Sequence, residues 1–153
     1  MPDSGKPVGC TCFALRKLNR TVSRLYDKHM AEAGLKTTQY SLLKWVSSAP
    51  LPIAELAARM NSERTTLTRN LKPLIDAGWV VLKPGSDSRQ RIATITPKGT
   101  KTIAAARDAW RAAQLELEQA LGSDAVRALH LHIDTALTRL TPLLGRQDDG
   151  LED

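Results

Sequence analysis

The sequence has no apolar run of the ~18 residues that a membrane-spanning helix needs. Its first residues, MPDSGKPVG, also lack the apolar core of a signal peptide. We therefore expect a cytoplasmic protein that does not enter a membrane. It has only two cysteines, Cys10 and Cys12, which we expect to be reduced by default in that compartment.

The common sequence signatures of enzymes are missing too. There is no glycine-rich phosphate-binding loop, no nucleophile elbow and no motif of paired carboxylates. We expect neither catalysis nor a cofactor. His130 and His132 are two residues apart on a predicted helix and point in different directions, whereas two helical zinc ligands are typically four residues apart. We therefore expect no metal site there.

Acidic residues are fewer than basic ones, at 16 against 22, so the 153-residue chain has a net charge of +6. Several of the acids are gathered in the final DDGLED, so the remainder is more basic than the total suggests. This balance favours an anionic partner. The length fits one domain, or one small domain with an added dimerisation arm.

The apolar residues predict helices in series. From Cys12 onward they recur at alternating steps of three and four, and Gly34 is a plausible left-handed cap at the end of this helix. A second helix is expected to be capped by Thr37 or Thr38, and a third, short helix has Pro52 in its first turn.

A fourth helix is predicted after a turn at Asn61, with Ser62 as its cap. Leu67, Leu71 and Leu74 lie within one narrow arc that must face the core. Pro73 is expected to kink this helix or to end its regular part early. Thr65, Arg69 and Lys72 fall on the opposite side, flanked by Ser62 and Thr66, so the outward face is made of short hydroxyls and long cations. Arg64 and Thr68 complete the set of candidate DNA-contacting residues in this region.

That outward face has two interpretations. It is an ordinary solvated surface, or it contacts nucleic acid, because hydroxyls approach phosphates closely and arginine offers a two-pronged donor to guanine. The stretch GWVVLKPGSDSRQRIATIT, which follows, predicts a β-hairpin with a basic tip. A short helix, a turn, a polar helix and a basic hairpin occur in that order in a winged helix-turn-helix.

In that architecture the polar helix enters the major groove of DNA, and the hairpin, or wing, reaches the neighbouring backbone or minor groove. Arg89 at the tip is the candidate probe, because narrow minor grooves attract arginine. Asp87 is expected to accept hydrogen bonds from its guanidinium and hold it extended. Read alone, SDSR is typical of a plain surface turn.

The chain resembles the multiple antibiotic resistance regulator (MarR-type) family. The resemblance rests on GLKTTQYSLLKWV, LPIAELAARMNSERTTLTRNLKPLIDAGWVVLKPGSDSRQR and ATITPKGT, in that order. It implies a homodimeric winged-helix regulator, usually a repressor that a small ligand or an oxidant releases from DNA. It also implies that residues 62–72 read the major groove and Arg89 the minor groove. The pair of cysteines in CTCF is a departure to which the resemblance assigns no role.

The C-terminal third predicts two long helices. Thr96 and Pro97 start the first helix, Gly122 ends it, and Ser123 can cap the second. Their apolar positions are Ile103, Ala106, Trp110, Ala113, Leu117 and Ala120, then Val126, Leu129, Ile133, Leu137, Leu140 and Leu144. An intramolecular helical hairpin is one interpretation. A dimer is favoured, because a two-fold pair presents two recognition helices to one palindrome.

The fold class is therefore mainly α with a small β-wing. We expect a flexible N-terminus (1–11), a helical dimerisation region (12–34 and 97–144), a winged helix-turn-helix domain (35–96) and a disordered acidic tail (145–153).

Two further features concern regulation: a site for an effector and the role of the two cysteines. The resemblance implies a ligand site near the first, second and fifth helices, where Arg20, Tyr26 and Tyr40 can offer a cation and phenols to a small aromatic acid. Cys10 and Cys12 start a helix near Arg16, which favours thiolate. Three roles are considered for them. They sense oxidants, they bind a metal between two subunits, or they are structural, with Cys12 packed as a small apolar side chain and Cys10 in a frayed helix end.

Two other functions compete with regulation. One is a thiol-based redox protein using Cys10 and Cys12, although thiol-disulfide enzymes usually show C-x-x-C beside a βαβ pattern. The other is an architectural DNA binder without regulation. Sequence specificity separates the two DNA-binding cases, because only a repressor strongly prefers one palindrome.

Overall fold

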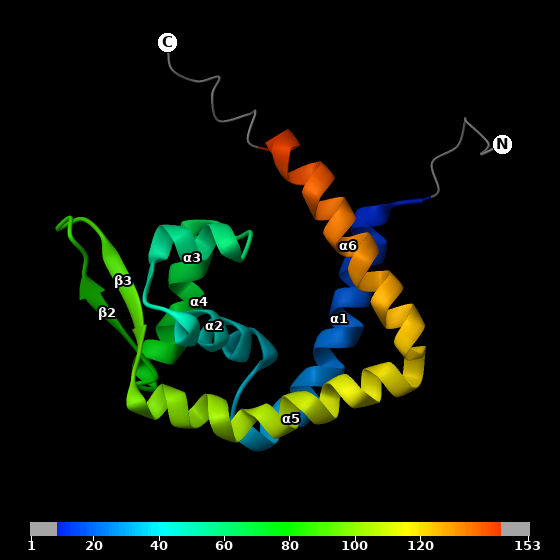
Figure 1. Cartoon of the computed structure of the whole chain (residues 1–153), viewed down its shortest axis with the longest axis horizontal. Helices are drawn as coiled ribbons and strands as arrows, with labels where there is room; N and C mark the ends of the chain where they lie inside the picture. Colours follow the sequence, from blue (N-terminus) through cyan, green and yellow to red (C-terminus); the bar gives the residue numbers. More distant parts are fainter. Residues whose placement is uncertain (1–8, 145–153) are drawn as a thin grey trace, which may run out of the picture. The chain divides into compact units, whose positions relative to one another are not determined.

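A computed structural model describes residues 9–144, so residues 1–8 of the predicted flexible N-terminus and the predicted acidic tail (145–153) lie outside the described part. Figure 1 shows a mainly helical chain with one small antiparallel sheet, as the sequence predicted. Its elements are α1 (Thr11–Met30), η1 (Ala31–Ala33), α2 (Thr37–Ser48), β1 (Leu51–Pro52), α3 (Ile53–Arg59), α4 (Arg64–Asp76), β2 (Val80–Pro84), β3 (Arg91–Ile95), α5 (Pro97–Leu121) and α6 (Ser123–Leu144).

The chain divides into two compact units, Met1–Ala113 and Gln114–Asp153, with the boundary inside α5. The first unit contains α1 to α4, with α3 and α4 in the order of the predicted helix-turn-helix, the hairpin β2–β3 that forms the wing, and the start of α5. The second contains the end of α5 and α6. No helix among residues 9–144 is both long and apolar enough to cross a membrane.

The core of the first unit is formed mainly by leucines of α2, α3 and α4, together with Val80 and Ala93 of the sheet. Its fully buried side chains are Met30, Leu42, Leu43, Val46, Leu56, Leu67, Leu71, Leu74 and Val80. The narrow leucine arc predicted for the fourth helix is therefore the face that packs inward. With this side fixed by apolar burial, the polar side of α4 must face out.

The sheet has the strand order β1-β3-β2, with all neighbours antiparallel. The hairpin β2–β3 was predicted, whereas β1 was not. β1 is only two residues long, and Leu51 pairs with Ala93 of β3. Pro52 is tolerated in it because a strand at the edge of a sheet can lack an N–H donor.

Three predicted turns are present. Gly34 and Gly122 have φ angles of 70° and 85°, and Asn61 has φ 47°, all in the left-handed region. The cap of the second helix differs from the prediction. Thr37 is already the first residue of α2, and its backbone N–H and hydroxyl both donate to Asp27 Oδ1 of α1 at 2.7 Å. A carboxylate from the preceding helix thus takes the place of a threonine cap.

The predicted cap at Ser62 is wrong, because α4 begins at Arg64 and Ser62 Oγ donates to the carbonyl of Glu63 at 3.4 Å. Pro73 does not end the helix, which continues to Asp76. Ser123 is the first residue of α6 rather than its cap, since Gly122 lies immediately before it.

Thr96 connects the wing to α5, which starts at Pro97 as predicted. Its hydroxyl donates to the carbonyl of Gly78 at 2.7 Å and accepts from the Gly99 N–H at 3.0 Å. Gly99 is buried, and a Cβ there would lie 2.3 Å from the carbonyl oxygen of Trp79. The wing and α5 can approach this closely only because Gly99 has no side chain.

Candidate functional site

The outward face of α4 is polar and solvent-exposed along its length. Six of the seven predicted DNA-contacting residues of this region are exposed: Arg64, Thr65, Thr66, Thr68, Arg69 and Lys72. The seventh, Ser62, precedes the helix and is half-buried. A shallow groove runs along this face and is lined by Arg64, Thr65, Thr68, Arg69 and Lys72, together with Ile75 and Asp76. The arrangement offers cations and hydroxyls side by side on one helix.

The cations of this face differ in whether they form an ion pair. Lys72 Nζ lies 2.8 Å from Asp76, and both side chains are exposed. Such an exposed pair four residues apart on a helix contributes only about 0.3–0.5 kcal/mol, so Lys72 can exchange it for a phosphate at little cost. Within residues 9–144, Arg64 and Arg69 have no carboxylate partner. Their guanidinium groups are available to an external anion.

The hydroxyls of α4 are not equivalent either. Thr68 Oγ1 donates to the carbonyl of Arg64, one turn earlier, at 2.9 Å. Its hydroxyl proton is therefore committed to the helix, while its oxygen still accepts hydrogen bonds. Thr65 and Thr66 have no hydroxyl bond of this kind within the described residues. These two side chains can both donate and accept.

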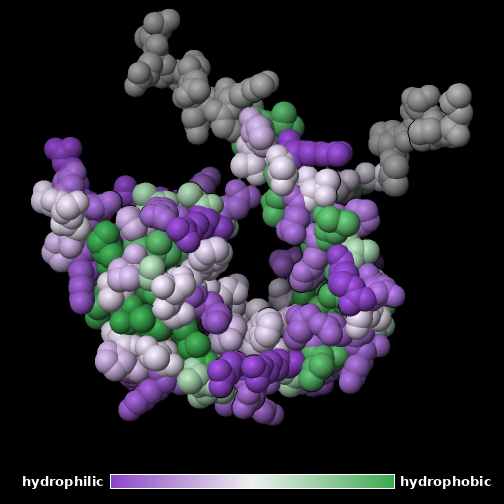
Figure 2. Space-filling view, viewed as in Figure 1, coloured by the Kyte–Doolittle hydropathy of each residue, from purple (hydrophilic) through white to green (hydrophobic). Residues whose placement is uncertain are grey.

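Arg89 lies exposed in the loop between β2 and β3, at the end of the wing. Asp87 supports it differently from the prediction: its Oδ1 accepts the backbone N–H of Arg89 at 3.0 Å rather than the guanidinium. This is the bond that an aspartate makes two residues onward in a turn. Asp87 thus shapes the loop and leaves the Arg89 side chain unrestrained by that carboxylate. Figure 2 shows hydrophilic and near-neutral side chains at this end of the hairpin.

Three arginines from separate elements meet around a second concavity, between the wing and the start of α3. Arg64 comes from α4, Arg89 from the wing loop and Arg91 from the start of β3. Sequence reasoning missed Arg91, although its position directly after the wing tip was a signal. Asp87 also lines this hollow, so three cations stand against one carboxylate, and the remaining positive charge favours an anion such as a backbone phosphate.

The structure does not bring the three predicted effector residues together. Tyr26 and Tyr40 are buried and Arg20 is exposed on α1. Only Tyr40 lines a cavity, of about 440 Å³, between α2 and the first half of α5. The cavity is lined by Tyr40, Ser41, Lys44, Trp45, Arg107, Trp110 and Arg111. The cations and indoles of this lining are residues that the sequence prediction did not include.

Tyr40 and Trp110 stack inside this cavity, with ring centroids 6.4 Å apart and planes 22° apart. Burial raises the pKa of the Tyr40 hydroxyl, and the nearby positive charges of Arg107 and Arg111 oppose that shift without cancelling it. The phenol therefore stays protonated at neutral pH. It can donate a hydrogen bond to an anionic ligand.

Cys10 and Cys12 are free and exposed. Cys10 is the N-cap of α1, where its Sγ accepts the backbone N–H of Phe13 at 3.4 Å. Within the described part of the chain, no group of three histidine, cysteine or acidic residues is placed to hold a metal.

Large apolar side chains lie exposed on α1 and, separately, on α6. On α1 they include Phe13 and Leu15, which are 63% and 54% exposed. On α6 they include Ile133, Leu137, Leu140 and Leu144, a row predicted from the sequence. Exposed apolar side chains in such numbers usually mark surfaces that another protein covers.

Comparisons with known proteins agree on one family. A family model described as "MarR family" matches residues 33–90. The M. tuberculosis transcriptional regulator MosR, in its crystal structure in complex with DNA, matches this chain with a TM-score of 0.76. The two sequences are 33% identical, and the match covers 86% of this chain and 98% of that one. A cysteine-to-serine mutant of E. coli MarR, complexed with operator DNA, has the same fold at 22% identity and a TM-score of 0.75, over 82% of this chain and 92% of that one.

A curated relative is more distant. An uncharacterized HTH-type transcriptional regulator of Bacillus subtilis, YwoH, is 28% identical over 83 residues. The match spans 54% of this chain and 61% of that protein, so it covers less than two thirds of the relative's length.

Proposed function

Because the chain belongs to the MarR family of transcriptional regulators, we propose that it binds double-stranded DNA as a homodimer and represses transcription from a palindromic operator. The observation that carries this proposal is the outward face of α4. It presents Arg64 and Arg69 without carboxylate partners beside exposed threonine hydroxyls. A solvated helix surface has no need for such a one-sided set of charges.

In this proposal α4 enters the major groove. Arg69 offers the bidentate donor that recognises the O6 and N7 of guanine, and Thr65 and Thr66 reach base edges or phosphates. Arg89 enters the adjacent minor groove, and Arg64 and Arg91 hold the phosphates between the two grooves. The M. tuberculosis relative was crystallised in complex with DNA, which supports this assignment.

Dimerisation is proposed from the exposed large apolar side chains of α1 and the exposed apolar row of α6. A two-fold pair places two copies of α4 on two half-sites, about 34 Å or one helical turn apart on DNA. It also doubles the number of phosphate contacts, so affinity and its salt dependence both rise.

Release from DNA is proposed to follow either of two signals. A small aromatic ligand would act by binding the DNA-incompetent conformation more tightly than the competent one. An oxidant would act on Cys10 and Cys12, whose thiols are exposed at the start of α1. A bond between two cysteines this close in sequence is strained, so a bond to the other subunit or to a small thiol is easier.

Selection of bound DNA from a random pool tests the proposal. The expected outcome is one enriched pseudo-palindrome, bound by a dimer. The bound operator is then challenged with a panel of aromatic acids and, separately, with hydrogen peroxide. Peroxide should release wild-type protein reversibly and leave a variant carrying Cys10→Ser and Cys12→Ser bound.

Enrichment of no sequence, with binding that depends only on salt, would point to an architectural DNA binder. Equal peroxide response in the double-serine variant would assign the cysteines a structural role. If neither peroxide nor any aromatic acid releases the operator, both proposed signals are wrong while the DNA-binding proposal stands.

A further inference from the structure

The hydroxyl of Thr96 forms hydrogen bonds with the ends of two helices. It accepts the backbone N–H of Gly99, the third residue of α5, at 3.0 Å. This is the bond that a threonine cap makes at the start of a helix. The same hydroxyl donates to the carbonyl of Gly78, two residues after the last residue of α4, at 2.7 Å. A hydroxyl has one proton to donate and can still accept, so Thr96 makes both bonds at the same time.

Two further hydrogen bonds connect the end of α4 to the start of α5. The ammonium group of Lys98 donates to the carbonyl of Ala77, the C-cap of α4, at 2.8 Å. The C-cap carbonyl has no partner inside the helix, and a cation is favoured at that end of the helix dipole. The backbone N–H of Thr96 donates to the carbonyl of Trp79 at 2.9 Å. We call this set of contacts, made by Thr96 and Lys98, the α4–α5 junction.

Glycines allow the two backbones of the junction to come this close. Gly78 has a φ angle of 74°, the left-handed conformation that commonly ends a helix. Gly99 is buried, and a Cβ there would meet the carbonyl oxygen of Trp79. The Thr96 hydroxyl reaches both helices only because the backbones approach so closely. The end of α4 is therefore held by close packing as well as by hydrogen bonds.

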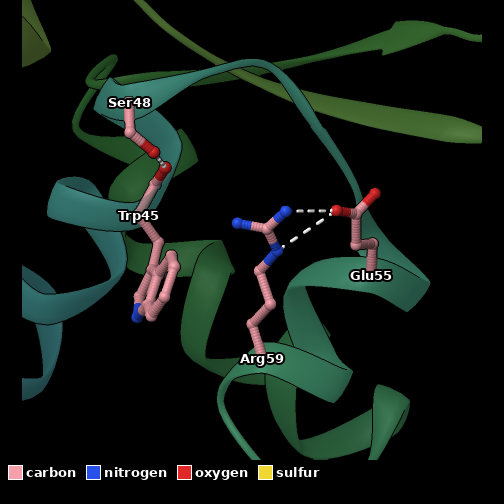
Figure 3. Close-up of polar contacts among 4 residues, drawn as sticks. All are labelled: Trp45, Ser48, Glu55 and Arg59. Atoms are coloured by element: carbon pink, nitrogen blue, oxygen red, sulfur yellow. Dashed lines mark hydrogen bonds and ion pairs between the residues drawn. The ribbon is translucent and has the colours of Figure 1, made fainter.

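The polar contact on the other side of α4 is looser. Residues 60–63 lead into α4 from α3, and Arg59 at the end of α3 lies beside the Trp45 ring of α2, as Figure 3 shows. Its guanidinium carbon is 5.5 Å from the ring centroid, a distance typical of a cation–π contact. Trp45 is 39% exposed and the Arg59 side chain 43% exposed. Exposed contacts of this kind are weakened by water, so α4 is held more firmly at its end than at its start.

The helix α5 extends the junction into the rest of the chain. It begins in the first compact unit and continues into the second, which contains α6. Under the proposed function, two subunits associate through the exposed apolar row of α6. The angle between α4 and α5 would then determine where each copy of α4 meets its half-site. The Thr96 hydroxyl, which is bonded to both helices, is the side chain best placed to fix that angle.

We propose that Thr96, assisted by Lys98, is a positioning residue for DNA recognition: it fixes α4 to α5 and thereby sets the half-site spacing that the dimer accepts. Thr96 acts through α4 and needs no contact with DNA. The spacing role rests on the proposed function, whereas the junction itself rests on the hydrogen bonds. A purely structural cap would stabilise the fold without selecting a spacing, and the two roles can be separated by experiment.

Substitutions at Thr96 separate the cap of α5 from the bond to α4. Thr96→Ser keeps both. Thr96→Asp keeps the cap, because a carboxylate accepts the Gly99 N–H well at this position, but it cannot donate to the carbonyl of Gly78. Thr96→Val keeps the shape of the side chain and loses both bonds. Thr100→Asp is the matched control, since it adds the same charge one turn later on α5, at an exposed residue whose hydroxyl bonds within its own helix.

The measurement is the affinity for the selected operator and for versions with the half-sites one base pair closer or farther apart. One base pair changes their separation by about 3.4 Å and rotates one half-site by about 35° relative to the other. Wild type and Thr96→Ser should strongly prefer one spacing. In Thr96→Asp the ratio of affinities for preferred and altered spacing should fall at least about threefold, the scale of one lost hydrogen bond. A smaller folded fraction lowers all affinities equally and cancels in this ratio.

The controls define what would overturn the spacing role. Thr100→Asp should keep the wild-type ratio, and so should Trp45→Leu, which removes the contact with Arg59 without changing the net charge. An unchanged ratio in Thr96→Asp, or an equal fall in either control, overturns the proposal.

Circular dichroism shows which variants fold, and Thr96→Val replaces Thr96→Asp if only the former does. If neither folds, Lys98→Met is compared with Lys101→Met, since both lysines are exposed on α5 and only Lys98 belongs to the junction. The Lys98 variant should then show the lower ratio, and equal ratios overturn the proposal.

Amide hydrogen exchange tests the junction without DNA. In Thr96→Asp the Gly99 amide should stay protected, because the carboxylate still accepts its N–H. The amides of Gly78 and Trp79, which bond back to the last turn of α4, should exchange faster than in wild type or Thr100→Asp. Unchanged exchange at these two amides overturns the junction. If DNA selection enriches no palindrome, the proposed function and the spacing role are both wrong, while exchange still decides whether Thr96 fixes α4 to α5.

Discussion

Single side chains determine what a DNA-binding surface can recognise, and Arg69 and Arg89 differ in this respect. Arg69 lies on α4 and Arg89 in the wing loop. Under the proposed function Arg69 reads a guanine through a bidentate contact, whereas Arg89 lies in the minor groove, which offers a degenerate pattern. We expect Arg69→Ala to weaken operator binding by about 1–3 kcal/mol and to relax sequence preference at one position. Arg89→Ala should weaken all sequences more uniformly. Fluorescence anisotropy with operator and scrambled duplexes measures both effects.

Lys101→Ala is a suitable control for both arginine variants, because it removes one positive charge from an exposed site on α5. It should change the affinity only slightly. If the double variant Arg69→Ala with Arg89→Ala binds the operator as wild type does, α4 and the wing are not the DNA-contacting surface.

The limits of prediction are also visible at this scale. The exposure of Arg69 followed from the leucine arc on the other side of α4. In contrast, the bond from Asp87 to the Arg89 backbone and the position of Arg91 beside Arg64 depend on the fold of a loop and on two distant segments. Residue type suggested that Asp87 has a partner. It did not determine which atom that partner would be.

Whole elements were predictable where their apolar spacing is regular. The leucines of α4 and the β-branched runs of β2 and β3 determine both type and orientation. The strand β1 was missed, because two residues provide no periodicity and Pro52 argues locally against a strand. Its pairing with β3 depends on tertiary contact. The start of α2 was misplaced for the same reason, since Asp27 comes from another helix.

The junction of the wing with α5 gives a prediction at the scale of elements. Helix propensity alone would make Gly99→Ala stabilising by about 1 kcal/mol. The structure predicts the opposite sign, because the new Cβ would lie 2.3 Å from the Trp79 carbonyl oxygen and 2.8 Å from Ile95 Cγ1. We expect a loss of about 1–3 kcal/mol in the free energy of unfolding, measured by urea denaturation.

For comparison, Lys101→Ala changes an exposed position of α5 to the same residue and should stay within about 0.5 kcal/mol of wild type. A Gly99→Ala protein as stable as wild type would show that the wing and α5 can separate without loss. In that case the close approach of the two elements would not be a requirement of the fold.

At the scale of the whole molecule, the cavity shows most clearly what sequence reasoning could not reach. Its lining combines α2 with a part of α5 more than sixty residues later in the chain. The predicted effector site at Arg20, Tyr26 and Tyr40 stays a prediction, and of these three residues Tyr40 lines the cavity. Arg20 and Tyr26 do not, because the first lies exposed on α1 and the second is buried elsewhere. Which side chains share a cavity is decided by packing between distant segments.

The apolar row of α6 gives a prediction about assembly. Leu137 is 47% exposed and lies in the row with Ile133, Leu140 and Leu144. If this row is covered by a second subunit, Leu137→Asp must either desolvate a carboxylate in an apolar interface or prevent association. We expect a monomer in analytical ultracentrifugation. Operator affinity should fall steeply, and the slope of log K against log salt should drop to about half, because only one half-site is contacted.

Thr135→Asp introduces the same charge on the side of α6 away from Leu137, since two residues turn a helix by about 200°. It should leave both the mass and the DNA affinity close to wild type. If Leu137→Asp remains dimeric with the wild-type salt slope, the row on α6 is not part of the dimer interface. The exposed Phe13 and Leu15 of α1 would then be the surface to test for dimerisation, because they are also large apolar side chains that this chain leaves uncovered. Comparing the slopes of the two aspartate variants therefore separates a loss of assembly from a mere change of charge.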